Sequence, residues 1–204
     1  MLPNPVDFDA IDRVVRQDNR QWIGQGPHLL AIGRLTREKG FDLLLQAFAE
    51  VRANYCTADL TIVGAGIEEA RLKAQCRGLG LDACVRFTGP ISQPASWFTD
   101  ANLFVLSSRE EGLPNALLEA AAAGVPIVAL PASGGIAELL SDRQGVWLAQ
   151  EITASALTSS LLTALQSLRQ EERFVHGWVD AFRMDRAIKQ YEELIDEFLD
   201  GGLS

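Results

Sequence analysis

Positive charge is scarce in this sequence. Its 204 residues include 18 Lys and Arg against 27 Asp and Glu, which gives a formal net charge of −9. A nucleic-acid-binding protein needs a concentrated basic surface to neutralise phosphates. The composition therefore argues against a nucleic-acid partner, while small anionic ligands stay compatible with it wherever a few basic residues gather.

Cysteine is sparse too. The three cysteines, Cys56, Cys76 and Cys84, form an odd set without the close pairing of a zinc or redox motif. We expect them to be reduced and to serve in packing.

Long apolar runs and a signal peptide are also missing. The longest apolar runs fall well short of the roughly 20 residues that span a bilayer, and the N-terminal stretch MLPNPVDFD lacks the charged and apolar regions of a signal peptide. With 48% hydrophobic residues, the chain is long enough to bury a substantial core. We expect a soluble, cytoplasmic, globular domain.

What the sequence does contain is a regular alternation of apolar runs and helical patterns. Such alternation is typical of stacked βαβ units with a buried parallel sheet. We therefore predict an α/β fold, a Rossmann-like doubly wound parallel sheet with helices on both faces. The expected strands lie at 28–35, 58–66, 84–89, 101–108 and 125–130, with a weaker one at 145–149.

The two ends of the chain depart from this alternation. Residues 1–27 open with two prolines and no strand, so we interpret them as a linker, or hinge, that enters the domain. Residues 28–170 are then the sheet domain and residues 171–204 a C-terminal helical segment. Within that segment, 186–199 has apolar residues at helical spacing, which favours an amphipathic helix packed on its own domain.

The first strand-to-helix turn carries two cations. Ligands of an open parallel sheet bind beyond the carboxyl ends of its strands, and here Arg34 and Lys39 flank a turn that follows Gly33. Two cations beside a glycine and a helix N-terminus suit a phosphate or diphosphate. A solvated basic turn, partly neutralised by Glu38, is the alternative.

The second turn, VGAGIEEARL (63–72), resembles the dinucleotide fingerprint G-x-G-x-x-G only at Gly64 and Gly66. At the third position stands Glu69, where close helix packing needs a glycine or an alanine. A nicotinamide or flavin cofactor is therefore not expected. Either the turn lets another group approach Gly64 and Gly66, or the glycines serve turn geometry alone.

The third turn leads into an almost wholly apolar helix within SSREEGLPNALLEAAAAG (107–124), for which Pro114 suits the first turn. Asn115 and Glu119 are its only polar residues and share one face at i,i+4 spacing. A carboxylate on so apolar an element needs a partner such as a hydroxyl or a cation. The alternative is that both residues form one solvated stripe.

Glu111 precedes this helix in a loop. Its carboxylate can accept hydrogen bonds from hydroxyl groups, and the neighbouring amides of Gly112 and Leu113 can donate them. That combination suits a sugar.

Taken in order, these motifs resemble the C-terminal, nucleotide-sugar-binding domain of retaining glycosyltransferases with the two-domain GT-B architecture, glycosyltransferase family 4. The resemblance covers about residues 1–150. Its segments are PNPVDF as the hinge, GRLTREKG as the diphosphate loop, VGAG as the second loop, RFTG as the strand beside the base, EEGLPNALLE with the E-x7-E element, and GGIAELL as the following turn.

The resemblance implies roles for particular residues. Arg34 and Lys39 would bind the donor's diphosphate and stabilise the charge on the leaving nucleotide. Glu111 would hold hydroxyls of the donor sugar, and with the two cations it completes the catalytic candidates. Glu119 would bind the ribose hydroxyls. The other expected donor-binding residues are Gly33, Gly64, Gly66, Arg86, Phe87, Gly112, Leu113, Pro114 and Asn115.

The implied reaction is transfer of a sugar from a UDP- or GDP-linked donor, with retention at the anomeric carbon and without a required metal or cofactor. The string Asp7-Phe8-Asp9 imitates the metal-binding D-x-D of another architecture, but it precedes the first strand and is not interpreted as a metal site. Neither His28 nor His176 lies at a motif turn. Neither is therefore expected to replace the histidine that the family's N-terminal domain contributes.

The expected partners are a nucleotide-sugar and the N-terminal acceptor domain of the same enzyme, which this chain lacks. Alone, the domain is expected to bind the donor and to transfer nothing. The form of the third motif suggests polysaccharide or glycolipid biosynthesis, with peripheral association of the full-length enzyme at the inner face of the membrane. A sugar-nucleotide epimerase of the same architecture and a non-catalytic binding module are the alternatives.

Overall fold

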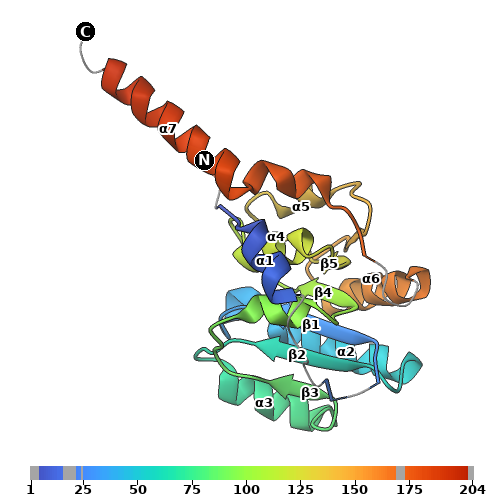
Figure 1. The fold of residues 1–204 in the computed structure, drawn as a ribbon. Helices are drawn as coiled ribbons and strands as arrows, with labels where there is room; N and C mark the ends of the chain where they lie inside the picture. The colour runs from blue at the N-terminus through green and yellow to red at the C-terminus, as the bar shows by residue number, and fades with distance from the viewer. Residues whose placement is uncertain (1–4, 16–21, 24, 169–172, 202–204) are drawn as a thin grey trace.

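A computed structural model of the chain contains one six-stranded sheet in which all neighbouring strands are parallel (Figure 1). The structure describes residues 5–15, 22–23, 25–168 and 173–201. The strand order is β3-β2-β1-β4-β5-β6, so the direction of winding reverses between β1 and β4. The strands are β1 (His28–Ile32), β2 (Asp59–Val63), β3 (Val85–Phe87), β4 (Leu103–Leu106), β5 (Ile127–Ala129) and β6 (Val146–Leu148).

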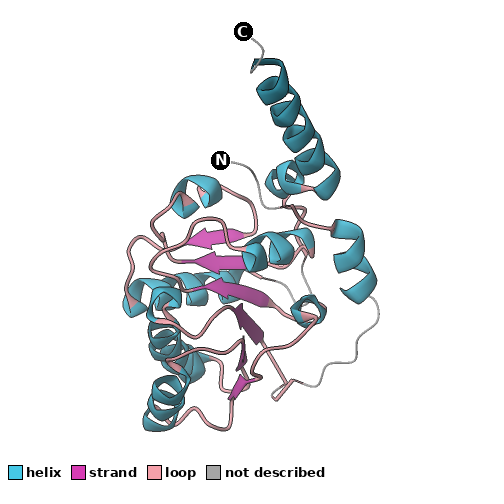
Figure 2. Ribbon diagram, turned by 90° about the vertical axis from the view of Figure 1, so that its left-hand side faces the viewer, coloured by secondary structure: helices cyan, strands magenta, loops and turns pink. Residues whose placement is uncertain are grey.

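Helices cover both faces of the sheet, as the alternation predicts (Figure 2). One face carries α2 (Phe41–Asn54), α3 (Glu69–Gly78) and α6 (Ala154–Ser167). The other carries α1 (Phe8–Val15), η2 (Pro94–Phe98), α4 (Asn115–Ala122), α5 (Ile136–Leu140) and η3 (Gly177–Phe182). The remaining elements are η1 (Arg37–Lys39) and α7 (Met184–Gly201).

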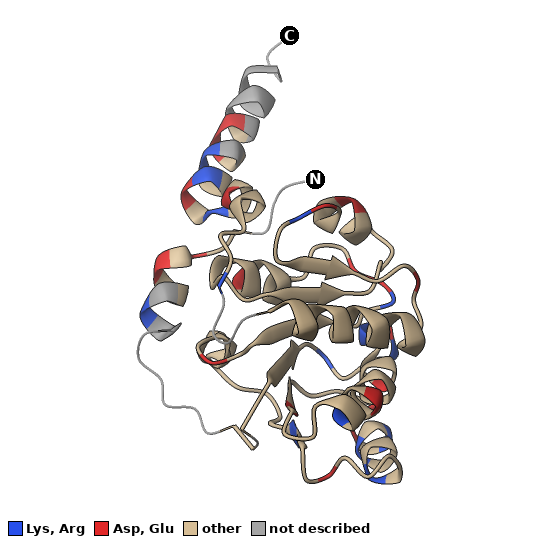
Figure 3. Cartoon of the chain, turned by 90° about the vertical axis from the view of Figure 1, so that its right-hand side faces the viewer, with Lys and Arg blue, Asp and Glu red and all other residues tan. Residues whose placement is uncertain are grey.

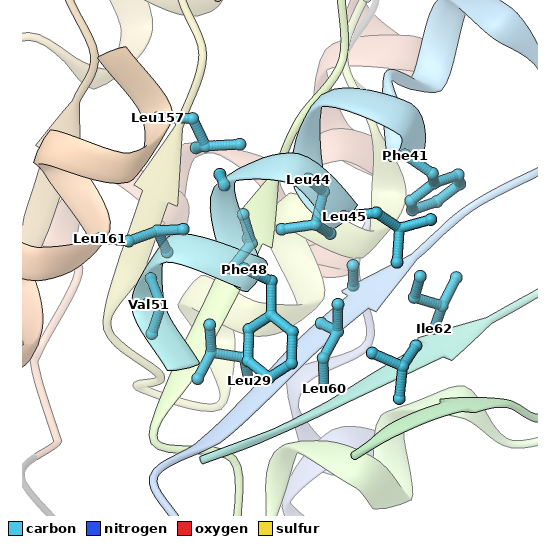
Figure 4. Close-up of a cluster of buried hydrophobic side chains, with 14 of the residues drawn as sticks. Leu29, Phe41, Leu44, Leu45, Phe48, Val51, Leu60, Ile62, Leu157 and Leu161 are labelled. Carbon is cyan, nitrogen blue, oxygen red and sulfur yellow. The ribbon is translucent and has the colours of Figure 1, made fainter. Parts of the chain in front are cut away.

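The core lies in two layers because successive side chains of a strand point to opposite faces of the sheet. Leu29 of β1 packs into the layer under α2, and Leu30 packs into the layer on the other side. In the first layer, Phe48 of α2 is fully buried with its ring toward the strands beside Leu29, while Val51 of the same helix lies next to Leu161 of α6 (Figure 4). Both layers pack against the strands, and the turns at the carboxyl ends of the strands start from this packed core.

Charged residues lie mainly on helices and loops, and the strands carry few of them (Figure 3). Asp59 of β2 is one exception, and its carboxylate lies 3.0 Å from Nδ1 of His28. The ring of Trp22 stacks on His28 with a centroid distance of 4.7 Å. His28 therefore serves packing at the amino end of the sheet.

The segment predicted to be a linker contains helix α1. Asp7 caps this helix, because its carboxylate accepts a hydrogen bond from the Ala10 amide at 2.9 Å. Val6 and Ile11 are buried against the second core layer. The Val6 amide also donates to the carbonyl of Phe182 at 2.8 Å. Residues 5–15 are thus docked on the domain and paired with the segment that leads into α7.

Only the start of α7 docks in this way. Ala187 is buried, whereas Ile188 and Ile195 are 47% and 56% exposed, and the helix projects away from the sheet (Figure 1). Among the described side chains of α7, the prediction of a helix packed along its own domain is therefore wrong beyond its first turns. Within the described ranges, no helix is both long enough and apolar enough to cross a membrane.

Two local expectations also change. After the first strand-to-helix turn, helix α2 begins only at Phe41, because Gly40 takes a left-handed conformation with φ 64° and separates α2 from η1. Cys76 and Cys84 are buried as predicted, but Cys56 is exposed in the turn after α2, so its predicted packing role is wrong.

Candidate functional site

The turns that follow β1, β4 and β5 meet at one edge of the sheet, since all the strands run in the same direction. They enclose a cavity of about 410 Å³. Four of the predicted site residues line it, namely Arg34, Lys39, Glu111 and Gly112. The other lining residues are Thr36, Glu38, Glu110, Ser133 and Gly134.

Lys39 and Glu111 form an ion pair across this cavity. The Lys39 Nζ lies 2.5 Å from Glu111 Oε1, and the side chains are 19% and 7% exposed. The Ser108 hydroxyl donates a second hydrogen bond to the same oxygen at 2.7 Å. The Glu111 amide donates to the carbonyl of Ser133 at 3.0 Å, which fixes the loop as well as the side chain. A pair that is largely removed from water and hydrogen-bonded in this way holds its geometry.

Arg34 is the exposed cation of the site. Its side chain lines the cavity, and within the described part of the chain it forms no ion pair. A hydrogen bond from the Thr36 hydroxyl, together with backbone hydrogen bonding, lowers the pKa of the neighbouring Glu38 carboxyl. The lining residues carry two cations, Arg34 and Lys39, against three carboxylates, Glu38, Glu110 and Glu111.

The glycines of the second turn let the first turn approach closely. A Cβ on Gly64, which has φ 139°, would overlap the carbonyl oxygen of Gly33, and a Cβ on Gly66 would overlap the carbonyl oxygen of Leu35. The Gly33 amide also donates to the carbonyl of Val63 at 3.0 Å. The group that approaches Gly64 and Gly66 is thus the backbone of the cation-bearing turn, which these glycines hold in place.

Gly134 likewise permits a close backbone approach, here to Glu111. It has φ 96°, and a Cβ at this position would overlap the carbonyl oxygen of Glu111. Glu110 forms an isolated parallel bridge with Ser133 just before it. The turn after β5 is therefore fitted against the loop that carries Glu111.

Glu119 is partly buried on α4 and lies outside the cavity lining. Burial raises the pKa of its carboxyl, and within the described residues no protein group donates a hydrogen bond to it. Asn115, four residues earlier, is exposed. The two residues therefore differ in their burial. Only for Glu119 does burial disfavour a charged carboxylate.

Arg86 and Phe87 extend to opposite faces of β3. The Arg86 guanidinium carbon lies 5.9 Å from the centroid of the Trp97 ring, and the Lys73 ammonium lies 5.9 Å from the centroid of the Phe87 ring. Both side chains are engaged in packing next to a strand at the sheet edge.

Leu113 and Pro114 form the entry to α4. Leu113 packs against the second core layer. Pro114 precedes the helix in an extended conformation, and its carbonyl accepts a hydrogen bond from the Leu117 amide at 3.1 Å. The prediction that Pro114 stands in the first turn is therefore wrong by one position, since α4 begins at Asn115.

Sequence reasoning missed the supporting groups of the site. The loop of Glu111 is contacted by Ser108 and Ser133. The turn after β1 and the loop after β4 are joined by the ion pair of Asp42 with Arg109. For Ser108 a signal was present, because a hydroxyl directly after a buried strand lies at the carboxyl edge of a parallel sheet.

Neither histidine approaches the cavity. His28 lies at the amino end of β1, while the Nε2 of His176 lies 3.0 Å from the carbonyl of Val125. Burial lowers the pKa of His176, against a smaller opposing effect of that hydrogen bond. Among the residues that the structure describes, no group of three or more His, Cys, Asp or Glu could hold a metal ion.

Comparison with known sequences identifies relatives. The family described as glycosyl transferases group 1 matches residues 26–167. An uncharacterised glycosyltransferase of Haemophilus influenzae is 31% identical over 65% of this chain and 38% of its own length. The amylovoran biosynthesis glycosyltransferase AmsK of Erwinia amylovora is 34% identical over 72% of this chain and 38% of its own length. The chain therefore spans under two fifths of each of these relatives.

Solved structures share the fold. A TM-score of 0.79 relates the chain to Anabaena Alr3699/HepE in complex with UDP and glucose, at 20% identity over 95% of this chain and 55% of that one. The C-terminal domain of LpcC, a glycosyl transferase group 1 family protein from Francisella tularensis, gives a TM-score of 0.69 at 20% identity, over 91% of this chain and 98% of that one. The Rossmann-like half of a GT-B architecture is thus the fold of this chain.

Proposed function

The chain belongs to the glycosyl transferases group 1 family, and on that premise we propose that it is the donor-binding domain of a sugar-transferring enzyme. Its ligand is then a sugar linked to a nucleoside diphosphate, with UDP or GDP as the nucleotide. The observation that carries this proposal is the convergence of Arg34, Lys39 and Glu111 on one cavity from two different turns.

The two cations suit the diphosphate. Arg34 is exposed and offers a planar fork of donors that can bind phosphate oxygens in pairs. Lys39 is held at the back of the same cavity by Glu111. When the bond to the sugar breaks, negative charge grows on the leaving nucleotide, and cations already in place stabilise that charge.

The carboxylates suit hydroxyl groups. Glu111 has one oxygen engaged by Lys39 and Ser108, and it can accept sugar hydroxyls together with the neighbouring amides of Gly112 and Leu113. Glu119 has a desolvated carboxylate without a donor among the described residues. Hydroxyls of the ribose would relieve that cost, which supports the role that the family resemblance implies.

The acceptor side is proposed to come from another domain. Relatives such as AmsK are longer than the part that this chain matches, which is 38% of the total, and no histidine lies at the described cavity. We propose that this domain alone binds the donor without transferring the sugar, and that the full enzyme transfers it with retention and without a metal. Cytoplasmic location, with a lipid-linked or polysaccharide acceptor at the inner face of the membrane, belongs to the same proposal.

Calorimetry with UDP and GDP tests the proposal. One of the two nucleotides is expected to bind with a stoichiometry of one, and Arg34→Ala is expected to weaken it by roughly tenfold, which equals about 1.4 kcal/mol. Arg37→Ala is the matched control, because Arg37 is an exposed arginine three positions away that does not line the cavity. Equal affinities of both variants, or no binding of either nucleotide at millimolar concentration, would contradict the proposed site.

A further inference from the structure

A pair of charged residues behind the cavity connects the turns that form it. Arg109, in the loop after β4, donates from both terminal nitrogens to the two carboxylate oxygens of Asp42, at 2.7 and 2.8 Å. Asp42 stands in the first turn of α2, directly after the turn that carries Lys39. The Arg109 guanidinium also donates to the carbonyl of Arg37 at 2.9 Å. The Arg109 side chain thus binds the start of η1, at Arg37, and the first turn of α2, at Asp42, from across the sheet edge.

The backbone of the same loop makes further contacts with that turn. The Arg109 amide donates to the carbonyl of Glu38 at 2.7 Å, and the Arg109 carbonyl accepts from the amide of Ser133 at 3.2 Å. The Ser107 hydroxyl donates to the carbonyl of Lys39 at 2.8 Å. Gly40 permits this approach, because a Cβ there would overlap the carbonyl oxygen of Ser107. The loop and the turn are therefore joined through both backbone and side-chain groups.

Asp42 reaches the second turn as well. Arg71 of α3 lies 3.9 Å from Asp42 Oδ2, the oxygen that also accepts the 2.8 Å hydrogen bond from Arg109, and it forms a 2.7 Å ion pair with Glu68. The Glu68 amide donates to the carbonyl of Leu35 at 2.9 Å. The Asp42 carboxylate is in this way the common partner of two groups, Arg109 in the loop after β4 and Arg71 in the helix after β2.

The pair is partly shielded from water, with 27% exposure of the Arg109 side chain and 19% of the Asp42 side chain. Burial alone would raise the pKa of Asp42, but hydrogen bonds and charge from Arg109 outweigh it and lower that pKa. Both residues therefore stay ionised near neutral pH. Neither residue lines the cavity.

We propose that Asp42 and Arg109 are positioning residues for donor binding, which hold in place the turn that carries Lys39 although neither of them lines the cavity. The inference rests on the proposed function, since it concerns the same nucleotide-binding site. It predicts that changes at Arg109 act through Lys39 and lose their effect once Lys39 is removed.

A double-mutant cycle tests this dependence. The affinity of the folded domain for UDP and GDP is measured by NMR titration, which covers millimolar dissociation constants, for the wild type, Arg109→Lys, Lys39→Gln and the double variant. Arg109→Lys keeps the charge but loses the bidentate fork, and we expect it to weaken binding roughly tenfold, while the same change in the Lys39→Gln background weakens it less than about twofold. Arg52→Lys makes the same change at the end of α2, where the guanidinium donates to the carbonyls of Cys56 and Ala58, and is expected to bind as the wild type does.

Three results would overturn the inference. Wild-type affinity of Arg109→Lys, or an equal loss in both Lys39 backgrounds, would show that Arg109 does not act through Lys39, and the proposed function would stand. Failure of the wild type to bind either nucleotide would remove the proposed function and this inference with it. If Arg109→Lys does not fold, Asp42→Asn, which keeps the shape of the side chain and removes its charge, enters the same cycle with the same expectations.

Discussion

The ammonium group of Lys39 lies 2.5 Å from a carboxylate oxygen of Glu111, although 72 positions separate the two residues in the chain. The pair joins the turn after β1 to the turn after β4, across the point where the winding of the sheet reverses. A diphosphate that binds Lys39 has to share this ammonium group with Glu111. Because of this competition, Glu111 also affects the affinity for the diphosphate, besides any contact that it makes with a sugar.

Removing the charge of Glu111 is therefore expected to strengthen the binding of a bare nucleotide. Glu111→Gln keeps a hydrogen-bond acceptor for Ser108 but frees Lys39 from its anionic partner. We expect the affinity for UDP or GDP to rise by roughly two- to fivefold, which corresponds to about 0.5–1 kcal/mol, as measured by calorimetry. Glu110→Gln removes the same formal charge from the cavity without touching the pair, and a rise of the same size there would refute competition for Lys39.

Gly134→Ala is expected to damage the site through the backbone. The new Cβ would overlap the Glu111 carbonyl, and φ 96° is unfavourable for alanine. We expect a loss of about 1–3 kcal/mol in the free energy of unfolding, measured by urea denaturation, together with weaker nucleotide binding. Gly78→Ala, in a helix with open space around it, is the control and is expected to be neutral or slightly stabilising. An equally small effect of both changes would contradict the close fit.

Glu119 is expected to lower stability at neutral pH. Burial raises its pKa in the folded state, so the folded state holds the proton more tightly than the unfolded state does. Protonation of Glu119 therefore stabilises the folded state at low pH. This stabilisation is lost as the pH rises through the raised pKa. Glu119→Gln should then raise the free energy of unfolding at pH 7, while nucleotide binding weakens.

The pH dependence of that gain is the check. At about pH 3.5, where the glutamate is protonated in both states, wild type and Glu119→Gln should unfold at nearly the same urea concentration. A gain that is the same at both pH values, or a loss of stability at pH 7, would mean that desolvation of the carboxylate is not its cause.

The N-terminal segment is expected to contribute to the stability of the domain. Ile11 of α1 is 5% exposed in the second core layer, so Ile11→Ala should lower the free energy of unfolding by about 2–4 kcal/mol. Arg13→Ala, on the exposed side of the same helix, should change it by less than about 0.5 kcal/mol. If thermal unfolding shows no difference between the two variants, residues 5–15 are a free linker after all.

Much of the fold could be predicted because each buried strand is a local signal. The run that became β4 is wholly apolar, and those that became β1 and β2 are mostly apolar, as is typical of strands covered on both faces. Helix α1 could not be predicted in the same way. It has only eight residues, too few for a clear period, and it follows two prolines that suggest a linker.

The site could be predicted only as a set of separate turns. The positions of Arg34, Lys39 and Glu111 at strand ends indicated where each would lie, but nothing in the spacing shows that Lys39 pairs with Glu111 or that Arg109 pairs with Asp42. These pairs depend on which strands are neighbours, and the order β1-β4 is a property of the whole sheet. The packing role predicted for Cys56 was wrong for a related reason. The exposure of a single residue in a turn produces no periodic pattern in the sequence.

Titration of the isotopically labelled domain with UDP and GDP, followed by amide NMR spectra, locates the bound nucleotide. A donor site at the cavity of Lys39 and Glu111 predicts saturable shifts that are largest for the amides of residues 33–40, 64–66 and 111–115. It also predicts that Arg34→Ala and Lys39→Gln reduce the affinity, whereas Arg37→Ala does not. Shifts that cluster elsewhere, for example along the groove beside β6 that is lined by Trp147 and Ser159, or no shifts at millimolar nucleotide, would contradict a donor site at the cavity of Lys39 and Glu111.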